Sequence, residues 1–430
     1  MTDSIALRLL ENKQLKLAKI GILTGIISGM LWGASGTVLW EALNFAPFTS
    51  LHPAAVMPAE LGEVGETLKA LVEAGGPPEA LEEAGAAMEM LVVAGASPQL
   101  LAEAGVTPEA VSAANEAVSA ASARFDYLAL IFGVAAGLAL AFLHDFCASL
   151  WVGGFNALKG KFREYGRSLS TTPGKMVCVA AIFGGPIGMS GYLLGVSFAG
   201  AVYSLPITAS YPALAAVLAT IFLRERNPLR VWVGVLACIC GSLIIAWGDP
   251  GDAPNFKLGL ALATLACIGW ATEGLISTYG MDMLDPDVAL GIREGFSALI
   301  LGLIVLPGLG LYIASQEVIL QGEVVTGWNL VLTTFANVDS PAIWLCVLGG
   351  FFGGFSYVAW YRALHSCGVA RAMAFNVTYA FWGVFFGFIM AQIMGREGGI
   401  TGNAWVGAIV ISIGAILVSI NPRELFKLRD

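Results

Sequence analysis

Long, continuous apolar runs separated by short polar segments dominate the pattern along this chain. About twenty apolar residues carry a helix across the hydrocarbon core of a bilayer. Because the runs are continuous rather than alternating, they favour membrane-spanning helices over the strands of a barrel. Ten spans are predicted, namely Lys19–Glu41, Tyr127–Trp151, Met176–Ser197, Tyr203–Leu223, Val231–Trp247, Lys257–Tyr279, Val288–Ala314, Ala342–Arg362, Ala372–Met394 and Asn403–Asn421.

The overall composition supports this pattern. Hydrophobic residues make up 57% of the 430 residues and charged residues 12%, with a mean hydropathy of +0.77. A soluble globular protein carries roughly twice that share of charges, so a soluble enzyme is excluded. Seven cysteines lie in or beside the predicted spans, where they fit packing roles better than a disulfide framework or a zinc site.

The basic residues predict how the chain crosses the membrane. Lys and Arg gather before the first span and after alternate spans, and the positive-inside rule places these segments in the cytoplasm. Both termini are then cytoplasmic, in a multi-pass protein of the bacterial inner membrane. The turn Met281–Asp287 has no Lys or Arg and gives no support. The residues that carry the prediction are Arg8, Lys13, Lys16, Lys159, Lys161, Arg163, Arg167, Arg224, Arg226, Arg230, Arg362, Arg371, Arg423, Lys427 and Arg429.

One segment, Asn44–Asp126, differs from the rest of the chain. It is rich in Ala, Glu and Gly. It contains twelve acidic residues and only two basic ones, Lys69 and Arg124, so its net charge is −10, whereas the whole chain carries −9. Prolines stand where short helices would begin, at Pro58, Pro77–Pro78, Ser97–Pro98 and Thr107–Pro108. They predict a small helical insertion outside the cytoplasm. A spacer role and a role in substrate capture or partner binding are both open.

Paired motifs relate the two halves of the remaining chain. Gly29–Ser35 parallels Cys267–Glu273, and Thr208–Tyr211 parallels Asn376–Tyr379. Trp232–Gly234 opens the fifth span as Trp405–Gly407 opens the tenth. Since each half holds five spans, the second half must run in the opposite sense across the membrane, which is an architecture of transporters. The expected regions are residues 1–43 (tail and first span), 44–126 (insertion), 127–247 (rest of the first repeat), 257–421 (second repeat) and 422–430 (tail).

Ionisable residues inside the spans are costly, so each needs a partner or a task. His144 and Asp145 lie late in the second span, Glu273 in the middle of the sixth, and Arg293 with Glu294 early in the seventh. In one interpretation Arg293 simply pairs with Glu273 or Asp145. In the other, a buried carboxylate without a close cation keeps a proton, which a proton-coupled site requires.

Aromatic residues are dense at the depth where the two halves meet. A quaternary ammonium has no hydrogen to donate, so aromatic faces hold it and a nearby carboxylate balances its charge. Core packing is the alternative for any single ring, and only the coincidence with Glu273 and the repeat favours a binding site. The aromatic residues are Trp32, Trp270, Tyr192, Tyr211, Tyr279, Tyr379 and Trp382.

Motifs of enzymes are missing from the sequence. It has no Gly-rich phosphate loop followed by Lys and Ser or Thr, no serine–histidine motif and no metal-ligand helix motif. We therefore expect neither an enzyme nor a bound cofactor or metal. The expected partners are a small cationic substrate and the lipid bilayer, without nucleic acid, and a homodimer stays open.

The motifs around Trp32 and Trp270 and the run from Tyr211 to Arg230 resemble the drug/metabolite transporter superfamily (EamA-like), with its five-plus-five inverted repeat. A narrower resemblance is to the LicB-type choline permeases and covers nearly all of the chain except Asn44–Asp126. It implies import of choline or a related quaternary amine. The residues that carry it are Gly185–Met189, Tyr211–Pro212, His144–Asp145, Trp270 with Glu273, Arg293, Asn376–Tyr379 and Trp382.

The expected fold is thus an all-α membrane protein of ten transmembrane helices in a five-plus-five inverted repeat, with the insertion between the first two. The expected substrate-binding residues are Trp32, Tyr211, Trp270, Glu273, Asn376, Tyr379 and Trp382, and the coupling candidates are Glu273, His144, Asp145 and Arg293.

Glu273 is expected both to neutralise the bound cation and to carry a proton, because its repeat mate Ser35 cannot titrate and the site then holds one acid. His144 and Asp145 are the alternative proton carriers. A second function stays open, namely an exporter or carrier of another metabolite such as an amino acid. Such a carrier needs a cation for the substrate carboxylate, and Arg293 is the obvious deep one.

Overall fold

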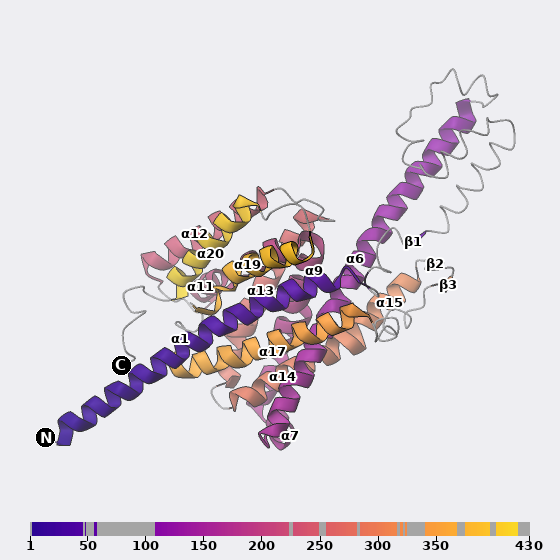
Figure 1. Cartoon of the computed structure of the whole chain (residues 1–430). Coiled ribbons are helices and arrows are strands. Elements are labelled where there is room, and N and C mark those ends of the chain that lie inside the picture. Colours follow the sequence, from indigo (N-terminus) through magenta and orange to yellow (C-terminus); the bar gives the residue numbers. More distant parts are fainter. Residues whose placement is uncertain are drawn as a thin grey trace. The chain divides into compact units, whose positions relative to one another are not determined.

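The computed structural model shows a helical protein (Figure 1). It divides into two compact units, the first made of Met1–Thr49, Val134–Gly308 and Val331–Asp430, and the second of Ser50–Gly133 and Leu309–Leu330. The residues that the structure describes are 2–45, 48, 56–57, 108–222, 227–248, 255–281, 284–315, 319–320, 323–324, 340–367, 375–395 and 401–419.

Helices make up nearly all of the described residues. They are α1 (Thr2–Ala42), α6 (Pro108–Leu158), α7 (Phe162–Leu169), α8 (Thr172–Ile182), the π-helix η3 (Phe183–Met189), α9 (Ser190–Ala199), α10 (Ala201–Thr208), α11 (Tyr211–Phe222), α12 (Leu229–Ala246), α13 (Phe256–Met281), α14 (Pro286–Ile300), the π-helix η4 (Leu301–Val305), α15 (Leu306–Ala314), α17 (Pro341–Cys367), α19 (Tyr379–Ile393) and α20 (Gly402–Ser419).

The helices confirm a multi-pass helical membrane protein. Within the described part of the chain, nine helical segments are long and apolar enough to cross a bilayer. The ninth predicted span, Ala372–Met394, corresponds to the shorter apolar helix α19, so the ten-helix arrangement stays a prediction. The nine are Lys19–Ala42, Leu130–Leu158, Thr172–Ala199, Ala201–Leu218, Leu229–Ala246, Phe256–Gly274, Pro286–Ala314, Pro341–Ala363 and Gly402–Ser419.

The second unit holds three short strands, β1 (Val56–Met57), β2 (Ile319–Leu320) and β3 (Glu323–Val324). They form an antiparallel sheet in the order β1-β2-β3, with Val56 opposite Leu320 and Ile319 opposite Val324. The sequence analysis predicted none of these strands. Most of the predicted helical insertion, including the helix starts at Pro58, Pro77–Pro78 and Ser97–Pro98, lies outside the described residues.

α6 continues without a break from Pro108 to Leu158. Pro108 was predicted as a helix start, and its missing N–H is tolerated at that first position. The helix then passes residue 126, where the sequence analysis placed the end of the insertion. That boundary is therefore not marked by the end of a helix.

Glycines allow the helices of the first unit to pack closely. α12 lies beside α20 (Figure 1), and a Cβ on Gly234 would lie 2.6 Å from the carbonyl oxygen of Gly414. A Cβ on Gly241 would lie 3.0 Å from the carbonyl oxygen of Gly407. Only residues without side chains permit this approach, as is common between membrane helices.

α1 packs along α17 and α19 in the same way (Figure 1). A Cβ on Gly33 would lie 2.8 Å from the backbone nitrogen of Gly383 in α19, and a Cβ on Gly349 in α17 would lie 2.6 Å from Leu39 Cδ2. α1 is therefore held between two helices that belong to the second half of the sequence. Its inner face carries Trp32.

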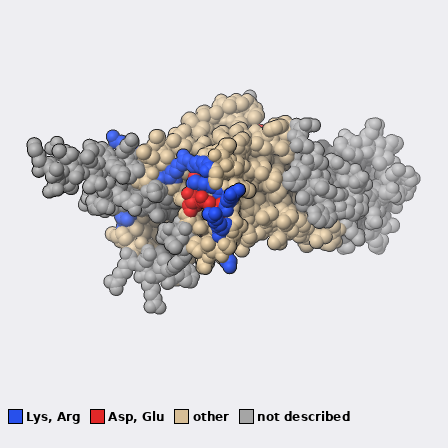
Figure 2. Space-filling view, turned by 90° about the horizontal axis from the view of Figure 1, so that it is seen from below, with Lys and Arg blue, Asp and Glu red and all other residues tan. Residues whose placement is uncertain are grey.

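Lysines after α6 pair with the acids that begin α14. Lys159 Nζ lies 2.7 Å from Asp287 Oδ2, and Lys161 Nζ lies 2.7 Å from Asp285 Oδ2. Burial alone would lower the pKa of Lys161, but hydrogen bonds to Asp285 and Asp287 outweigh it and raise the pKa. Figure 2 shows a face where basic side chains gather around acidic ones. Asp285 and Asp287 belong to the turn Met281–Asp287, which has no basic residue of its own. They thus lie at the same end of the bundle as Lys159 and Lys161.

Candidate functional site

A cavity opens inside the first unit between α1, α11, α13, α14, α17 and α19. Its empty space, including any part open to solvent, is about 710 Å³. The residues that line it are Ser28, Trp32, Tyr211, Trp270, Glu273, Gly274, Leu290, Arg293, Ser356, Tyr357, Trp360, Tyr361, Asn376 and Tyr379.

Trp32 is the centre of the aromatic wall. Its ring centroid lies 5.7 Å from that of Trp270 and 5.2 Å from that of Tyr357, both in edge-to-face arrangements. Tyr379 lies 6.5 Å away on the same wall. Behind it, fully buried Tyr192 stacks on Trp32 at 5.8 Å without lining the cavity. Such offset and edge-to-face contacts fix the rings in place.

A small polar patch lies on another side of the cavity. Asn376 Nδ2 donates a hydrogen bond of 2.7 Å to Ser28 Oγ, and Ser356 Oγ donates one of 2.8 Å to the Ser28 carbonyl oxygen. The two serine hydroxyls lie 3.1 Å apart. This patch can accept or donate a hydrogen bond to a polar group of a bound molecule.

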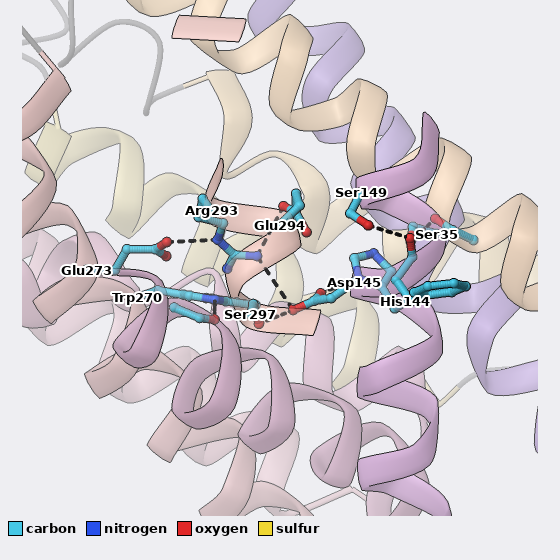
Figure 3. Close-up of polar contacts among 12 residues, drawn as sticks. Ser35, His144, Asp145, Ser149, Trp270, Glu273, Arg293, Glu294 and Ser297 are labelled. Carbon is cyan, nitrogen blue, oxygen red and sulfur yellow. Dashed lines mark hydrogen bonds and ion pairs between the residues drawn. The ribbon is translucent and has the colours of Figure 1, made fainter. Parts of the chain in front are cut away.

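Arg293 lies between three carboxyl groups (Figure 3). Its Nε lies 2.9 Å from Glu273 Oε1, while its Nη1 lies 3.1 Å from Glu294 Oε1 and 3.8 Å from Asp145 Oδ2. Arg293 and Glu294 are buried, whereas the Glu273 side chain keeps 15% exposure at the cavity. The predicted pairing of Arg293 with Glu273 or Asp145 is confirmed for both. Among the described residues that line the cavity, Glu273 is the one acid, and Arg293 links it to two further acids, Asp145 of α6 and Glu294 of α14.

His144 and Asp145 form the far side of this network. His144 Nδ1 lies 2.8 Å from Asp145 Oδ1, and Ser297 Oγ donates a hydrogen bond of 2.5 Å to Asp145 Oδ2. Ligand-type atoms of His144, Asp145 and Glu294 lie within 4.8 Å of one another, close enough to hold a metal ion. The Arg293 guanidinium already supplies positive charge to both carboxylates, so this arrangement does not require a metal.

Local sequence explains how the site is built around η3. Its run of glycines, interrupted by Pro186, replaces the α-helical pattern by a π-helix, a feature often found at functional sites. A Cβ on Gly184 would overlap the Glu273 carboxyl, and a Cβ on Gly185 would overlap the Ser297 hydroxyl. Trp270 Nε1 donates a hydrogen bond of 3.1 Å to the Gly184 carbonyl oxygen. The bare backbone of η3 thus positions both the carboxylate and the indole.

The structure brings most of the predicted residues together, with some differences. His144 and Asp145 lie one layer behind the cavity, and Arg293 joins them to it. Trp382 lies outside the cavity, packed against Phe385 and Phe386. The side chain of Tyr279 lies outside the described part of the chain. The predicted residues that line the cavity are Trp32, Tyr211, Trp270, Glu273, Arg293, Asn376 and Tyr379.

Sequence reasoning missed the contribution of α17. Tyr357, Trp360 and Tyr361 all line the cavity, as do Ser28 and Ser356. The three aromatic residues are spaced three and four apart, which places them on one face of a helix. That spacing was visible in the sequence, but no matching motif in the first half drew attention to it.

A bundle of apolar helices around an internal cavity is an arrangement found in polytopic membrane transporters. Residues 116–247 match the EamA-like transporter family, which confirms the predicted resemblance to that family. Protein LicB of Haemophilus influenzae is 26% identical over 254 residues, which are 59% of this chain and 77% of the relative.

A solved chain described only as "Crystal structure of protein" is also similar, with 14% identity and a TM-score of 0.39. The alignment covers 68% of this chain and 91% of that chain. A similarity this low supports no conclusion about function.

Proposed function

We propose that this chain imports choline or a related quaternary amine across the inner membrane, as a secondary transporter. The observation that carries the proposal is the composition of the cavity. Seven aromatic side chains surround a space next to one partly exposed carboxylate, Glu273. Aromatic faces attract a quaternary ammonium, each by about 0.5–2 kcal/mol, and no hydrogen-bond donor is needed from the ligand.

The arrangement of charge supports a cationic substrate. Around the cavity, Arg293 is the one cation of the described lining, and Glu273, Glu294 and Asp145 face it. The network therefore has a net negative charge when its carboxyls are ionised. Since the potential of a bacterial membrane is negative inside, it also favours entry of a cation.

Contacts between the matched motifs support a five-plus-five inverted repeat as the framework of transport. Trp32 and Trp270, which hold matched places in the two halves, meet edge to face. The Tyr379 hydroxyl lies 3.4 Å from Thr208 Oγ1, which joins the second pair of motifs. Matched positions that meet one another are expected when a substrate site lies at the interface of two repeats.

The glycine contacts of α12 and α20 give independent support. Gly234 and Gly407 hold matched places, and Gly241 and Gly414 follow them at equal spacing. Gly234 packs on Gly414 while Gly241 packs on Gly407, so each matched glycine meets the second glycine of the other helix. A two-fold relation between the halves produces this reciprocal pattern.

A carrier of amino acids is the second candidate, because Arg293 lines the cavity as such a carrier would require. Its guanidinium is already paired with Glu273 and Glu294. A substrate carboxylate would have to displace one of these acids and would meet the charge of the others. The geometry therefore favours the cationic substrate.

Thermal-shift measurements on the purified protein would test these alternatives. Choline, betaine and a set of amino acids are added separately, and a bound ligand raises the melting temperature according to its concentration and affinity. We expect stabilisation by choline, and none by amino acids. Stabilisation by an amino acid without any by choline would refute the proposal and support the second candidate.

A further inference from the structure

The charges around Arg293 do not balance if every carboxyl is ionised. Asp145, Glu273 and Glu294 carry three negative charges, whereas Arg293 supplies one positive charge. All of these side chains except Glu273 are essentially removed from solvent. A buried charge without a partner is strongly disfavoured. At least one of the three carboxyls must therefore keep a proton or share one with a protonated His144.

The partners of the three carboxyls identify which one keeps it. Asp145 has a contact on each oxygen, from His144 and from Ser297, with Arg293 nearby. Glu273 pairs with Arg293 Nε and reaches the partly exposed cavity. Glu294 also pairs with Arg293, through Oε1, but it is 0% exposed and its Oε2 has no hydrogen-bond partner among the described residues. Of the three, Glu294 is the least supported as an anion.

We propose that Glu294 holds the exchangeable proton of this site, and that Arg293 links this proton to a cation bound at Glu273. The proposal rests on the proposed transport of an organic cation and names a residue for its coupling. It differs from the expectation in which Glu273 itself carries the proton. In this proposal Glu273 contacts the substrate. Glu294 lies behind it and acts only through Arg293, by holding or releasing a proton.

Arg293 has the geometry for this link. It lines the cavity and reaches Glu294, and its Nη2 is buried without a partner among the described residues. A cation beside Glu273 competes with Arg293 for the Glu273 carboxylate and repels the guanidinium. Arg293 then has a free donor to offer to Glu294, which stabilises the Glu294 carboxylate.

The step conserves charge. The O–H bond of the Glu294 carboxyl breaks, the proton leaves to water, and the new carboxylate pairs with Arg293. No bond to the substrate forms, and one positive charge in the network replaces another. Arg293 on the same helix pairs with Glu294, and His144 and Asp145 on α6 lie close to it. Glu273 on α13 and Tyr357 and Tyr361 on α17 interact with Glu294 electrostatically.

Infrared spectroscopy of the purified protein tests the proton without any substrate. The carbonyl stretch of a protonated carboxylic acid is recorded at neutral pH for wild type and for single variants. We expect this band in wild type, in Asp145→Asn and in Glu273→Gln, and its loss in Glu294→Gln. Glu164→Gln, which removes an exposed acid of α7, is the matched control and should change nothing.

Glu294→Asp is the control for a folding defect caused by substitution at this position. It keeps the acid, so it should keep a protonated carboxyl band. A wild-type spectrum without the band, or a band that survives in Glu294→Gln, overturns the proposal.

Calorimetry with choline tests the link. Titrations in buffers with different ionisation enthalpies give the number of protons released, and we expect up to about one per bound choline in wild type. Glu294→Gln should bind choline within about threefold of wild type but release no proton. Glu273→Gln should lose most of its affinity.

Proton release that persists in Glu294→Gln, or a requirement for sodium in place of proton release, overturns the link. A wild-type protein that shows the acid band but does not bind choline would refute the proposed substrate and leave the proton on Glu294.

Discussion

Trp270 is the residue whose contacts best fit a wall of a cation site. Its indole meets Trp32 and Tyr211, and its N–H is fixed on the Gly184 carbonyl oxygen. Trp270→Ala should weaken choline binding about five- to thirty-fold, since the loss of one cation–π face costs about 1–2 kcal/mol. Tyr379→Ala should have an effect of the same size. Isothermal titration calorimetry measures both.

Trp247→Ala is the matched control for these variants. Trp247 is 82% exposed at the end of α12 and does not line the cavity, so the same loss of a ring should leave the affinity for choline unchanged. If both cavity variants bind choline as wild type does, the aromatic wall is not the binding site.

Single residues also show how far the sequence could predict the site. Trp270 and Glu273 were identifiable because a costly carboxylate inside an apolar span stands one turn from an indole and matches a motif in the other half. Trp382 shared a helical face with Tyr379 in the sequence, yet it packs against phenylalanines. Spacing along one helix gives a face, but it does not say which neighbour covers that face.

The short π-helix η3 is the element that gives the site its geometry. Gly184→Ala would place a methyl group where the Glu273 carboxyl lies. We expect the carboxylate to move away from Arg293 and the affinity for choline to fall about tenfold, or about 1.4 kcal/mol. Calorimetric titration with choline measures the change, and the melting temperature shows whether the fold is kept.

Gly153→Ala on α6 controls for the general effect of adding a methyl group to a membrane helix. No atom lies within 4 Å of the added Cβ there, and Ala has the higher helix propensity. This variant should bind choline with wild-type affinity. Equal affinities for the Gly184 and Gly153 variants would show that η3 does not position Glu273.

The elements themselves were predictable to different extents. Hydrophobic length identified the spans, because a bilayer requires about twenty apolar residues whatever the packing. The same pattern predicted one helix over Met176–Ser197, where the structure has α8, η3 and α9 in succession. Gly184, Gly185 and Pro186 signalled irregularity, but the choice of a π-helix depends on Glu273 and Ser297, which lie far away in the sequence.

At the scale of the whole molecule, the cavity and its charge network belong to one unit. Every residue that lines the cavity falls within Met1–Thr49, Val134–Gly308 or Val331–Asp430. Most of the acidic segment predicted as an insertion falls instead in the second unit, together with Leu309–Leu330. This division was only partly foreseen, because nothing in the pattern of Ile319–Leu320 indicated pairing with Val56–Met57.

Replacing residues 58–107 by a short Gly/Ser linker should therefore leave transport of choline intact. The variant keeps β1 and its pairing with β2, and it keeps the whole of α6, which begins at Pro108. It removes most of the charge of −10 that the segment carries in the sequence, and salt screens charges that face water. Uptake of radiolabelled choline into proteoliposomes is compared between wild type and variant at equal protein. A folded variant that binds choline in calorimetry but no longer transports it would contradict a dispensable role and assign the segment a part in the transport cycle.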